Sequence, residues 1–419
     1  MNKKLICLLL LIVCIAPALS GCGSVGAKRE LSSLAIVLGM AIDKPDGSED
    51  VEFENFGEDS EKLLLTTQVV RTLATSQNST GSESSGSGSG SGGEGDLGNT
   101  YWNVKTVGGN ILETLRSAIH ITNRRLYIAH NQVVIISKEV AEKGIAEYLD
   151  YFFRDHETRY DVDLIISDGR AEDVLDVGSH LESFPAEDLK KLIEKQRDGG
   201  FAPFCSLFSF MSDYKIPNKS ALIPYVKIVE PENDEISPYL YVAGSAVFKR
   251  DKMVTSLKEK QTRGALWLLG EVKSGVIALK YKDTNVSLEI MEGNGDFKAS
   301  YKDGRIKVKG DISATCVLGE YQGTDSITSK TMEDLRKECA AEIEKEVRSA
   351  FDAVREEQAD IYGVAEYFYR YQPKIWNKIS DDFEELYKDA ELELNVDVEL
   401  IRTGSLLEPA DESGGGSDD

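Results

Sequence analysis

The chain has 419 residues, of which 41% are hydrophobic and 29% charged, so it holds enough apolar side chains for more than one folded core. Its 72 acidic residues outnumber its 48 basic residues and give a net charge of −24, which disfavours binding to negatively charged nucleic acid. The one long apolar run, residues 5–19, is shorter than the roughly 20 residues that a membrane-spanning helix needs. The composition therefore excludes a wholly disordered chain and a polytopic membrane protein.

The amino terminus has the layout of a secretion signal. Lys3 and Lys4 precede an apolar segment, and Leu19-Ser20-Gly21-Cys22 ends it with small residues before a cysteine. This ending resembles the lipobox of a bacterial lipoprotein. The resemblance implies that the signal peptide, residues 1–21, is cleaved and that Cys22 carries a diacylglycerol (palmitate-type chains) and an N-acyl lipid. The alternative is an ordinary secretion signal with an incidental cysteine. In the lipoprotein interpretation the lipid holds the protein on the membrane, because its charge would not.

Residues that could carry chemistry are few. Beyond Cys22 only Cys205, Cys316 and Cys339 remain, far apart and odd in number, which indicates neither a disulfide framework nor a zinc site, although one bridge could form. We expect them to be small buried side chains. The chain also lacks the motifs of phosphate-binding loops, zinc proteases and serine hydrolases. The sequence therefore predicts no enzyme, no metal site and no cofactor other than the lipid.

Strands and helices alternate in residues 22–195, which predicts an N-terminal α/β domain. We expect strands at 31–42, 62–73, 99–107, 132–136 and 162–166, and helices at 111–119, 140–153 and 186–197. Residues 76–98 are almost all Ser, Gly, Thr, Asn and acidic residues, a composition typical of a flexible chain. Because strand-like segments flank them, we interpret them as a loop inserted between two strands of one sheet. A linker between domains is the alternative.

The rest of the chain predicts two further domains and a tail. Residues 196–281 are rich in Pro and Gly and indicate a loop-rich middle domain with a strand at 239–248, while the structure of the apolar run 264–269 stays open. Residues 282–407 indicate a C-terminal α+β domain. It would contain one antiparallel sheet with turns at 293–295 and 303–304, a long helix at 331–358 begun by Thr331, and a closing strand at 390–401. Residues 408–419 predict a disordered acidic tail. The expected fold is α+β, with three domains, mixed sheets and packed helices.

Large aromatic side chains crowd the span from residue 360 to residue 379. They are Tyr362, Tyr367, Phe368, Tyr369, Tyr371 and Trp376. So many rings cannot share one helical face, and some must point away from the core. Because exposed aromatic clusters are enriched at protein interfaces, these six are candidate partner-binding residues. The alternative is that they line the groove between the long helix and the closing strand.

Several long segments together resemble the C-subunit lipoproteins of bacterial spore-germination nutrient receptors, the Ger(x)C family. They are LAIVLGMAID (34–43), LYIAHNQVVIIS (126–137), EKGIAEYLDYFFRDHETR (142–159), residues 243–277, ADIYGVAEYFYRYQPKIWNKI (359–379) and LELNVDVELIRTG (392–404). The resemblance covers most of the chain after the signal, and its C-terminal segments are the most specific.

The resemblance implies a three-domain mixed α/β protein without enzymatic activity, anchored by lipid on the outer face of the spore inner membrane. It also implies two partners, an integral-membrane A subunit and a transporter-like B subunit, and no nucleic acid. In this interpretation the chain is the non-catalytic C subunit of a germinant receptor, required for germinant-triggered germination. A second hypothesis is a solute-binding lipoprotein that delivers a small ligand to a membrane transporter, which would place a ligand cleft between domains.

Overall fold

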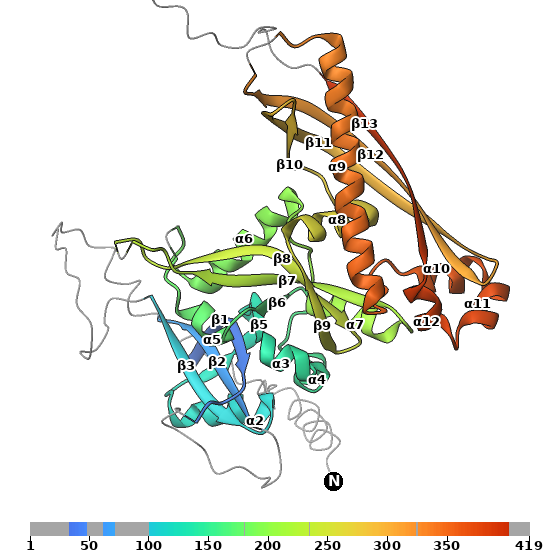
Figure 1. Cartoon of the computed structure of the whole chain (residues 1–419). Coiled ribbons are helices and arrows are strands. Elements are labelled where there is room, and N and C mark those ends of the chain that lie inside the picture. Colours follow the sequence, from blue (N-terminus) through green and yellow to red (C-terminus); the bar gives the residue numbers. More distant parts are fainter. Residues whose placement is uncertain are drawn as a thin grey trace, which may run out of the picture.

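A computed structural model describes residues 33–47, 62–71, 100–179, 181–233, 235–323 and 326–401 (Figure 1). Within these residues the predicted α+β fold is confirmed, since helices pack against two separate mixed sheets. The predicted signal peptide, Cys22, the Ser/Gly insert 76–98 and the acidic tail 408–419 lie outside the described residues.

The first sheet contains nine described strands with a parallel centre. In spatial order they are β3 (Tyr101–Gly108), β2 (Leu63–Val70), β1 (Leu34–Asp43), β5 (Val133–Ser137), β6 (Asp163–Ser167), β7 (Ser220–Val229), β8 (Tyr239–Lys249) and β9 (Lys252–Leu257), with β4 (Arg125–Tyr127) beside the start of β1. The central pairs β1–β5, β5–β6 and β6–β7 are parallel. The outer pairs, β3–β2 and β2–β1 on one side and β7–β8 and β8–β9 on the other, are antiparallel. The continuous apolar sequences of β5 and β6 follow from this position, because helices cover both faces of a parallel centre.

Helices cover the two faces of the first sheet with separate apolar cores. One face packs against α2 (Ile111–Ser117), α3 (Lys138–Lys143), α4 (Ala146–Arg154) and α7 (Leu207–Lys215), and the other against α5 (Ala171–Asp176) and α6 (Pro185–Gly199). Short 3₁₀ turns, η3 (Ala118–His120) and η4 (Ile128–His130), flank β4. The predicted single helix 140–153 is wrong. It breaks at Gly144, whose φ of +132° ends α3, and Ile145 donates its N–H to the Asp251 carbonyl at 2.9 Å.

The insert 76–98 joins two neighbouring antiparallel strands, as predicted. Val70 pairs with Tyr101 in the β2–β3 ladder, and the Arg71 N–H donates to the Thr100 carbonyl at 2.8 Å. The two ends of the connection are therefore held together by the sheet itself.

Shortening residues 76–98 to a few residues should change the free energy of unfolding by less than about 1 kcal/mol, because closing a loop costs only about 0.6 kcal/mol per doubling of its length. Urea unfolding of the shortened chain, beside a control with a scrambled insert of equal length, checks this prediction. A loss of stability in the shortened chain alone would mean that the insert makes stabilising contacts.

The second sheet has the order β10 (Gly275–Tyr281), β11 (Thr284–Lys302), β12 (Arg305–Tyr321) and β13 (Glu391–Ile401), and α9 (Ser329–Glu356) runs along it (Figure 1). The expectation of one antiparallel sheet is wrong for its last strand, because β13 lies parallel to β12. A return helix between β12 and β13 allows this direction. The predicted turn at Asp303-Gly304 is confirmed, with φ of 52° and 79°.

The predicted turn at residues 293–295 is also wrong, since β11 continues through it. A Cβ atom on Gly295 would lie 1.8 Å from the Trp267 carbonyl oxygen, and one on Gly293 would lie 2.6 Å from the Trp267 ring. The apolar run 264–269 belongs to helix α8 (Glu259–Leu269). The two glycines let this helix approach the strand closely.

The long helix α9 buries an apolar stripe along one face. Its members are Met332, Leu335, Cys339, Ile343, Val347, Phe351 and Val354. The predicted start at Thr331 is corrected: the N-cap is Thr328, whose hydroxyl accepts the Thr331 N–H at 3.1 Å in a reciprocal capping box.

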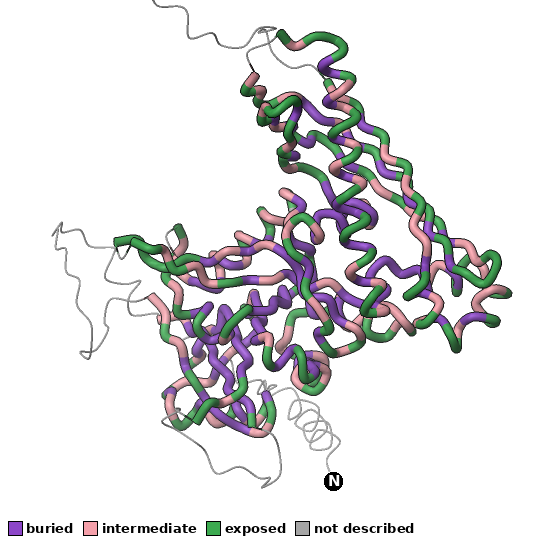
Figure 2. The backbone as a smooth tube through the Cα atoms, viewed as in Figure 1, coloured by how far each residue is buried: buried purple, intermediate pink, exposed green. Residues whose placement is uncertain are grey.

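One continuous core joins the two sheets. Val247 of β8 and Leu257, the last residue of β9, belong to the same apolar cluster as α8, α9 and the second sheet. Figure 2 shows buried residues along the first sheet and where α8 meets α9. The first sheet continues across the predicted boundary at 195/196, and the boundary at 281/282 falls inside the β10–β11 hairpin. The sheets thus divide the chain into two parts, which meet at α8.

Candidate functional site

The six aromatic residues predicted as partner-binding lie between α9 and β13, at one end of the second sheet. Three short helices form this end: α10 (Val364–Tyr371), α11 (Pro373–Ile379) and α12 (Phe383–Lys388). Gly363, with a φ of +76°, turns the chain into α10. Asp360 then accepts the N–H groups of Val364 and Ala365 at 2.9 and 2.8 Å. These contacts fix where α10 begins.

The structure divides the aromatics as the helical argument predicted. Tyr362 and Phe368 are buried, Tyr367 and Trp376 are half-buried, and Tyr369 and Tyr371 are 66% and 70% exposed. The division follows from the helix geometry, because Val364, Ala365 and Phe368 share the inward face of α10 and Tyr369 follows on the outward side.

The buried rings hold this segment against the rest of the second core. Tyr362 stacks on Phe351 of α9 with ring centres 5.8 Å apart, and Trp376 meets Phe383 at 5.6 Å. On the strand side, Tyr367 contacts Phe297 of β11 at 5.9 Å, and the Gln372 amide donates to the Ala299 carbonyl at 2.7 Å. Part of the aromatic span is therefore core, packed on α9 and β11.

The outward residues form a compact mixed surface, which we call the α10–α11 surface: Tyr369, Arg370, Tyr371, Lys374 and Lys378. All five are exposed, and Tyr371 leans on Tyr367 with ring centres 5.1 Å apart. Its positive residues stand out in a chain of net charge −24, and Arg370 forms an ion pair with Glu366. Tyrosine and arginine side chains are typical of the residues that dominate protein–protein binding.

The segment is also bonded to the first sheet. The Ser220 N–H donates to the Asp360 carbonyl at 3.0 Å, and Lys219 forms ion pairs with Asp213 at 2.9 Å and with Glu366 at 3.3 Å. Burial raises the pKa of the Asp360 carboxyl to about 6, although its backbone hydrogen bonds act in the opposite direction. Sequence reasoning missed Asp360, and its place three residues before a glycine and four before a helix is the signal that could have indicated it.

Comparisons with known proteins identify the chain's relatives. Residues 27–228 match the family described as "Spore germination protein N-terminal domain", and residues 243–404 match "Spore germination B3/ GerAC like, C-terminal". The chain belongs to the GerAC family of spore germination proteins. Spore germination protein KC of Bacillus subtilis (strain 168) is 25% identical, and the alignment covers 96% of each chain. Spore germination protein YndF of the same organism is also 25% identical, with 95% of each chain covered.

A crystal structure of the GerBC protein shares the fold of this GerAC-family chain. Its TM-score is 0.50 at 17% identity, and the match covers 87% of this chain and 97% of that one. None of the helices that the structure describes is long and apolar enough to cross a membrane.

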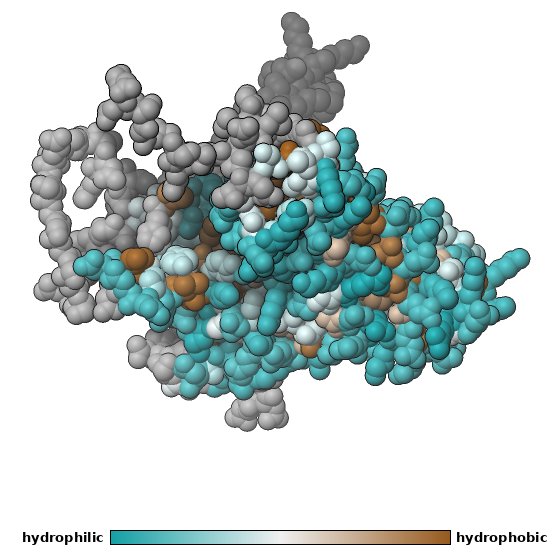
Figure 3. Space-filling view, turned by 45° about the horizontal axis from the view of Figure 1, so that its top comes forward, coloured by the Kyte–Doolittle hydropathy of each residue, from teal (hydrophilic) through white to brown (hydrophobic). Residues whose placement is uncertain are grey.

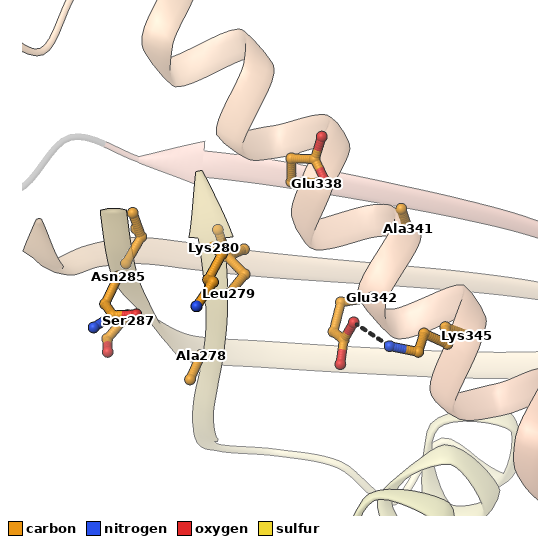
Figure 4. Close-up of a pocket in the computed structure, with 10 residues that line it drawn as sticks. Ala278, Leu279, Lys280, Asn285, Ser287, Glu338, Ala341, Glu342 and Lys345 are labelled. Carbon is orange, nitrogen blue, oxygen red and sulfur yellow. Dashed lines mark hydrogen bonds and ion pairs between the residues drawn. The ribbon is translucent and has the colours of Figure 1, made fainter. Parts of the chain in front are cut away.

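Two surface hollows in the described part of this GerAC-family protein each lie beside one sheet. One, of about 440 Å³, lies between β10, β11 and α9 (Figure 4), where Glu342 and Lys345 pair with each other at 3.4 Å. Another, of about 650 Å³, lies beside β6 and β7, where Arg170 forms ion pairs with Glu172 and Asp46. The inter-domain cleft expected of a solute-binding lipoprotein therefore does not coincide with either hollow.

The buried ionisable side chains of the GerAC-family fold include an aspartate with backbone partners and three cysteines. Asp43 accepts the N–H groups of Ala171 and Glu172 at 2.8 Å each, and burial raises its pKa to about 6. Cys205, Cys316 and Cys339 are buried free thiols, and burial raises the pKa of Cys205 to about 12. In the part of the chain that the structure describes, no three His, Cys, Asp or Glu side chains are grouped to hold a metal ion.

Proposed function

We propose that this protein is the non-catalytic C subunit of a nutrient germinant receptor. In this role it is anchored by lipid on Cys22 to the outer face of the spore inner membrane, and acts with integral-membrane A and B subunits. The observation that carries the proposal is the family match over residues 27–228 and 243–404, which leaves little of the chain after Cys22 unmatched. The end-to-end alignments with curated spore germination proteins support it.

The α10–α11 surface is the proposed docking site for the membrane subunits. Its aromatic and positive side chains are exposed, while the rings beneath them are packed on α9 and β11 and therefore hold the surface rigid. A preformed surface loses little conformational entropy on binding. Figure 3 shows a mostly hydrophilic face of the protein, on which hydrophobic residues form separate patches.

Cys22→Ala should abolish membrane attachment and leave the fold intact. The substitution removes the lipidated thiol, and the acidic surface gives no electrostatic attraction to an anionic bilayer. Membrane fractionation and incorporation of labelled palmitate check this prediction, with Cys205→Ala as a cysteine control that should keep both. Equal membrane retention of the Cys22→Ala protein would show that lipid on this residue is not the anchor.

An alanine scan should separate the core rings from the docking rings. Phe368→Ala should lower the free energy of unfolding by about 3–5 kcal/mol, since it empties a buried site. Tyr369→Ala and Tyr371→Ala should change it by less than about 0.5 kcal/mol, because both side chains are exposed, and yet abolish receptor assembly or germination. Urea unfolding and germination rates of the same variants check this. If every variant that impairs germination is also destabilised by a kcal/mol or more, the docking role is wrong.

A further inference from the structure

A second aromatic surface lies on the first sheet. It consists of Phe153 at the end of α4, Tyr160, and Phe208 in α7, and we call it the aromatic patch. Phe153 and Tyr160 stack with ring centres 5.9 Å apart, and the Phe208 N–H donates to the Tyr160 carbonyl at 3.2 Å. Tyr160 is 50% exposed and Phe208 61% exposed, so these rings face outward.

The patch lies beside the point at which the chain enters the first sheet. Leu34, the first residue of β1, pairs with Arg125 of β4, and Arg125 forms an ion pair with Glu157 at 2.7 Å. Ile36 of β1 lines one hollow of about 400 Å³ together with Arg159 and Asp161, the two neighbours of Tyr160. The start of the described fold and the aromatic patch are thus close neighbours.

The distance from this point to the proposed anchor is limited by covalent geometry. Eleven residue steps separate Cys22 from Ser33, and a chain of that length spans at most about 40 Å in any conformation. If Cys22 is held in the bilayer, the end of the first sheet that carries β4 and the aromatic patch must stay within that distance of the lipid surface. The limit applies first to this end of the protein, because the chain segment from Cys22 joins the fold there.

The two exposed arginines beside the patch already have acidic partners. Arg154 and Arg159 form ion pairs with Asp150 and with Asp161 at 2.5 and 2.8 Å, and Lys190 lines the same hollow as Arg159 and Asp161. The rings are therefore the groups of the patch best suited to contact lipid. Aromatic side chains favour the boundary between lipid headgroups and acyl chains, where an apolar ring and a polar edge can both be satisfied.

We infer that the aromatic patch rests on the lipid surface of the bilayer, so that the anchored protein has a fixed orientation. The inference rests on the proposed lipid anchor at Cys22. In Figure 1, α4 lies on the lower side of the molecule, α10 and α11 lie at the right, and α7 lies between them. Contact of the patch with lipid would leave the α10–α11 surface available for a protein partner.

The test places a fluorescent reporter at each surface of the full lipidated chain. Tyr160→Cys and Phe208→Cys are labelled separately with an environment-sensitive dye, and Tyr369→Cys, an equally exposed tyrosine on the α10–α11 surface, is the control. The native thiols Cys205, Cys316 and Cys339 are buried and should not react in the folded protein. Each labelled protein is bound to vesicles of phosphatidylglycerol and cardiolipin with and without nitroxide-labelled lipid, and sedimentation measures attachment.

The expected result is a shift of dye emission to shorter wavelength and quenching by nitroxide lipid at residues 160 and 208, with neither at residue 369. If the protein sediments with the vesicles but aqueous iodide quenches both patch labels as strongly as in free protein, the patch does not touch lipid, although the anchor stands. A shift that requires the membrane subunits and shows no lipid quenching would assign the patch to a protein partner and overturn the inference. Failure to sediment would overturn the anchor and this inference with it.

Discussion

Glu346→Ala should lower the free energy of unfolding by about 3–5 kcal/mol, because it leaves a buried guanidinium without its partner. Arg263 in α8 donates to Glu346 in α9 through two bonds, at 2.9 and 2.5 Å, and the two side chains are only 3% and 2% exposed. Arg263 also donates to the Val276 carbonyl at 2.7 Å and lies over the Phe201 ring. One side chain thus joins α8, α9, β10 and the loop after α6.

Replacing both partners provides the control. The double variant Arg263→Met with Glu346→Leu removes both charges and keeps apolar volume, so it should recover most of the lost stability. Urea unfolding followed by circular dichroism measures all three proteins. A single variant as stable as the native chain would mean that water reaches this pair, contrary to its burial here.

Gly264→Ala should cost about 3 kcal/mol or more, through backbone contact alone. A Cβ atom at this position in α8 would lie 2.1 Å from the Glu346 carbonyl oxygen and 2.4 Å from its carbon, both in the backbone of α9. A side chain could rotate away, but the backbone of a long helix cannot, so α8 and α9 would have to separate. Since this crossing joins the two sheets, the second sheet should loosen with it.

Gly169→Ala is the matched control for this substitution. No atom lies within 4 Å of the Cβ that it would add, so its stability should stay within about 0.5 kcal/mol of the native value. The midpoints of thermal unfolding of the two variants provide the comparison. Equal midpoints would show that α8 and α9 are not packed as closely as described.

The sequence was most informative where a local pattern determines structure. The apolar runs of β5 and β6 and the stripe of α9 indicate elements that the structure contains, because burial on two faces or on one stripe leaves a direct mark in the sequence. The Ser/Gly insert could likewise be placed between two strands, since strand-like segments flank it.

The misassigned elements depend on contacts that are distant in the chain. Gly293 and Gly295 look like turn residues, but they are small because α8 crosses them. The parallel direction of β13 depends on where α9 to α12 return the chain, which no pattern within β13 records. Gly144 breaks a predicted helix because Ile145 bonds to Asp251, more than a hundred residues later.

The candidate site could be predicted only in part. Crowding of six rings into one span requires that some point outward, but which ones do so depends on how Asp360 and Gly363 set the start of α10. The aromatic patch was not predicted, because Phe153, Tyr160 and Phe208 come together only through the packing of α4 and α7.

The most direct test of the proposed function is affinity purification of the tagged chain from detergent-solubilised inner membranes of spores, followed by mass spectrometry. The account predicts that two integral-membrane proteins co-purify with the native chain in fixed proportion. It also predicts that both are lost with Tyr369→Ala plus Tyr371→Ala, a variant expected to remain folded and lipidated. A native chain that supports germination but is recovered without any membrane partner would contradict the assignment as a receptor subunit.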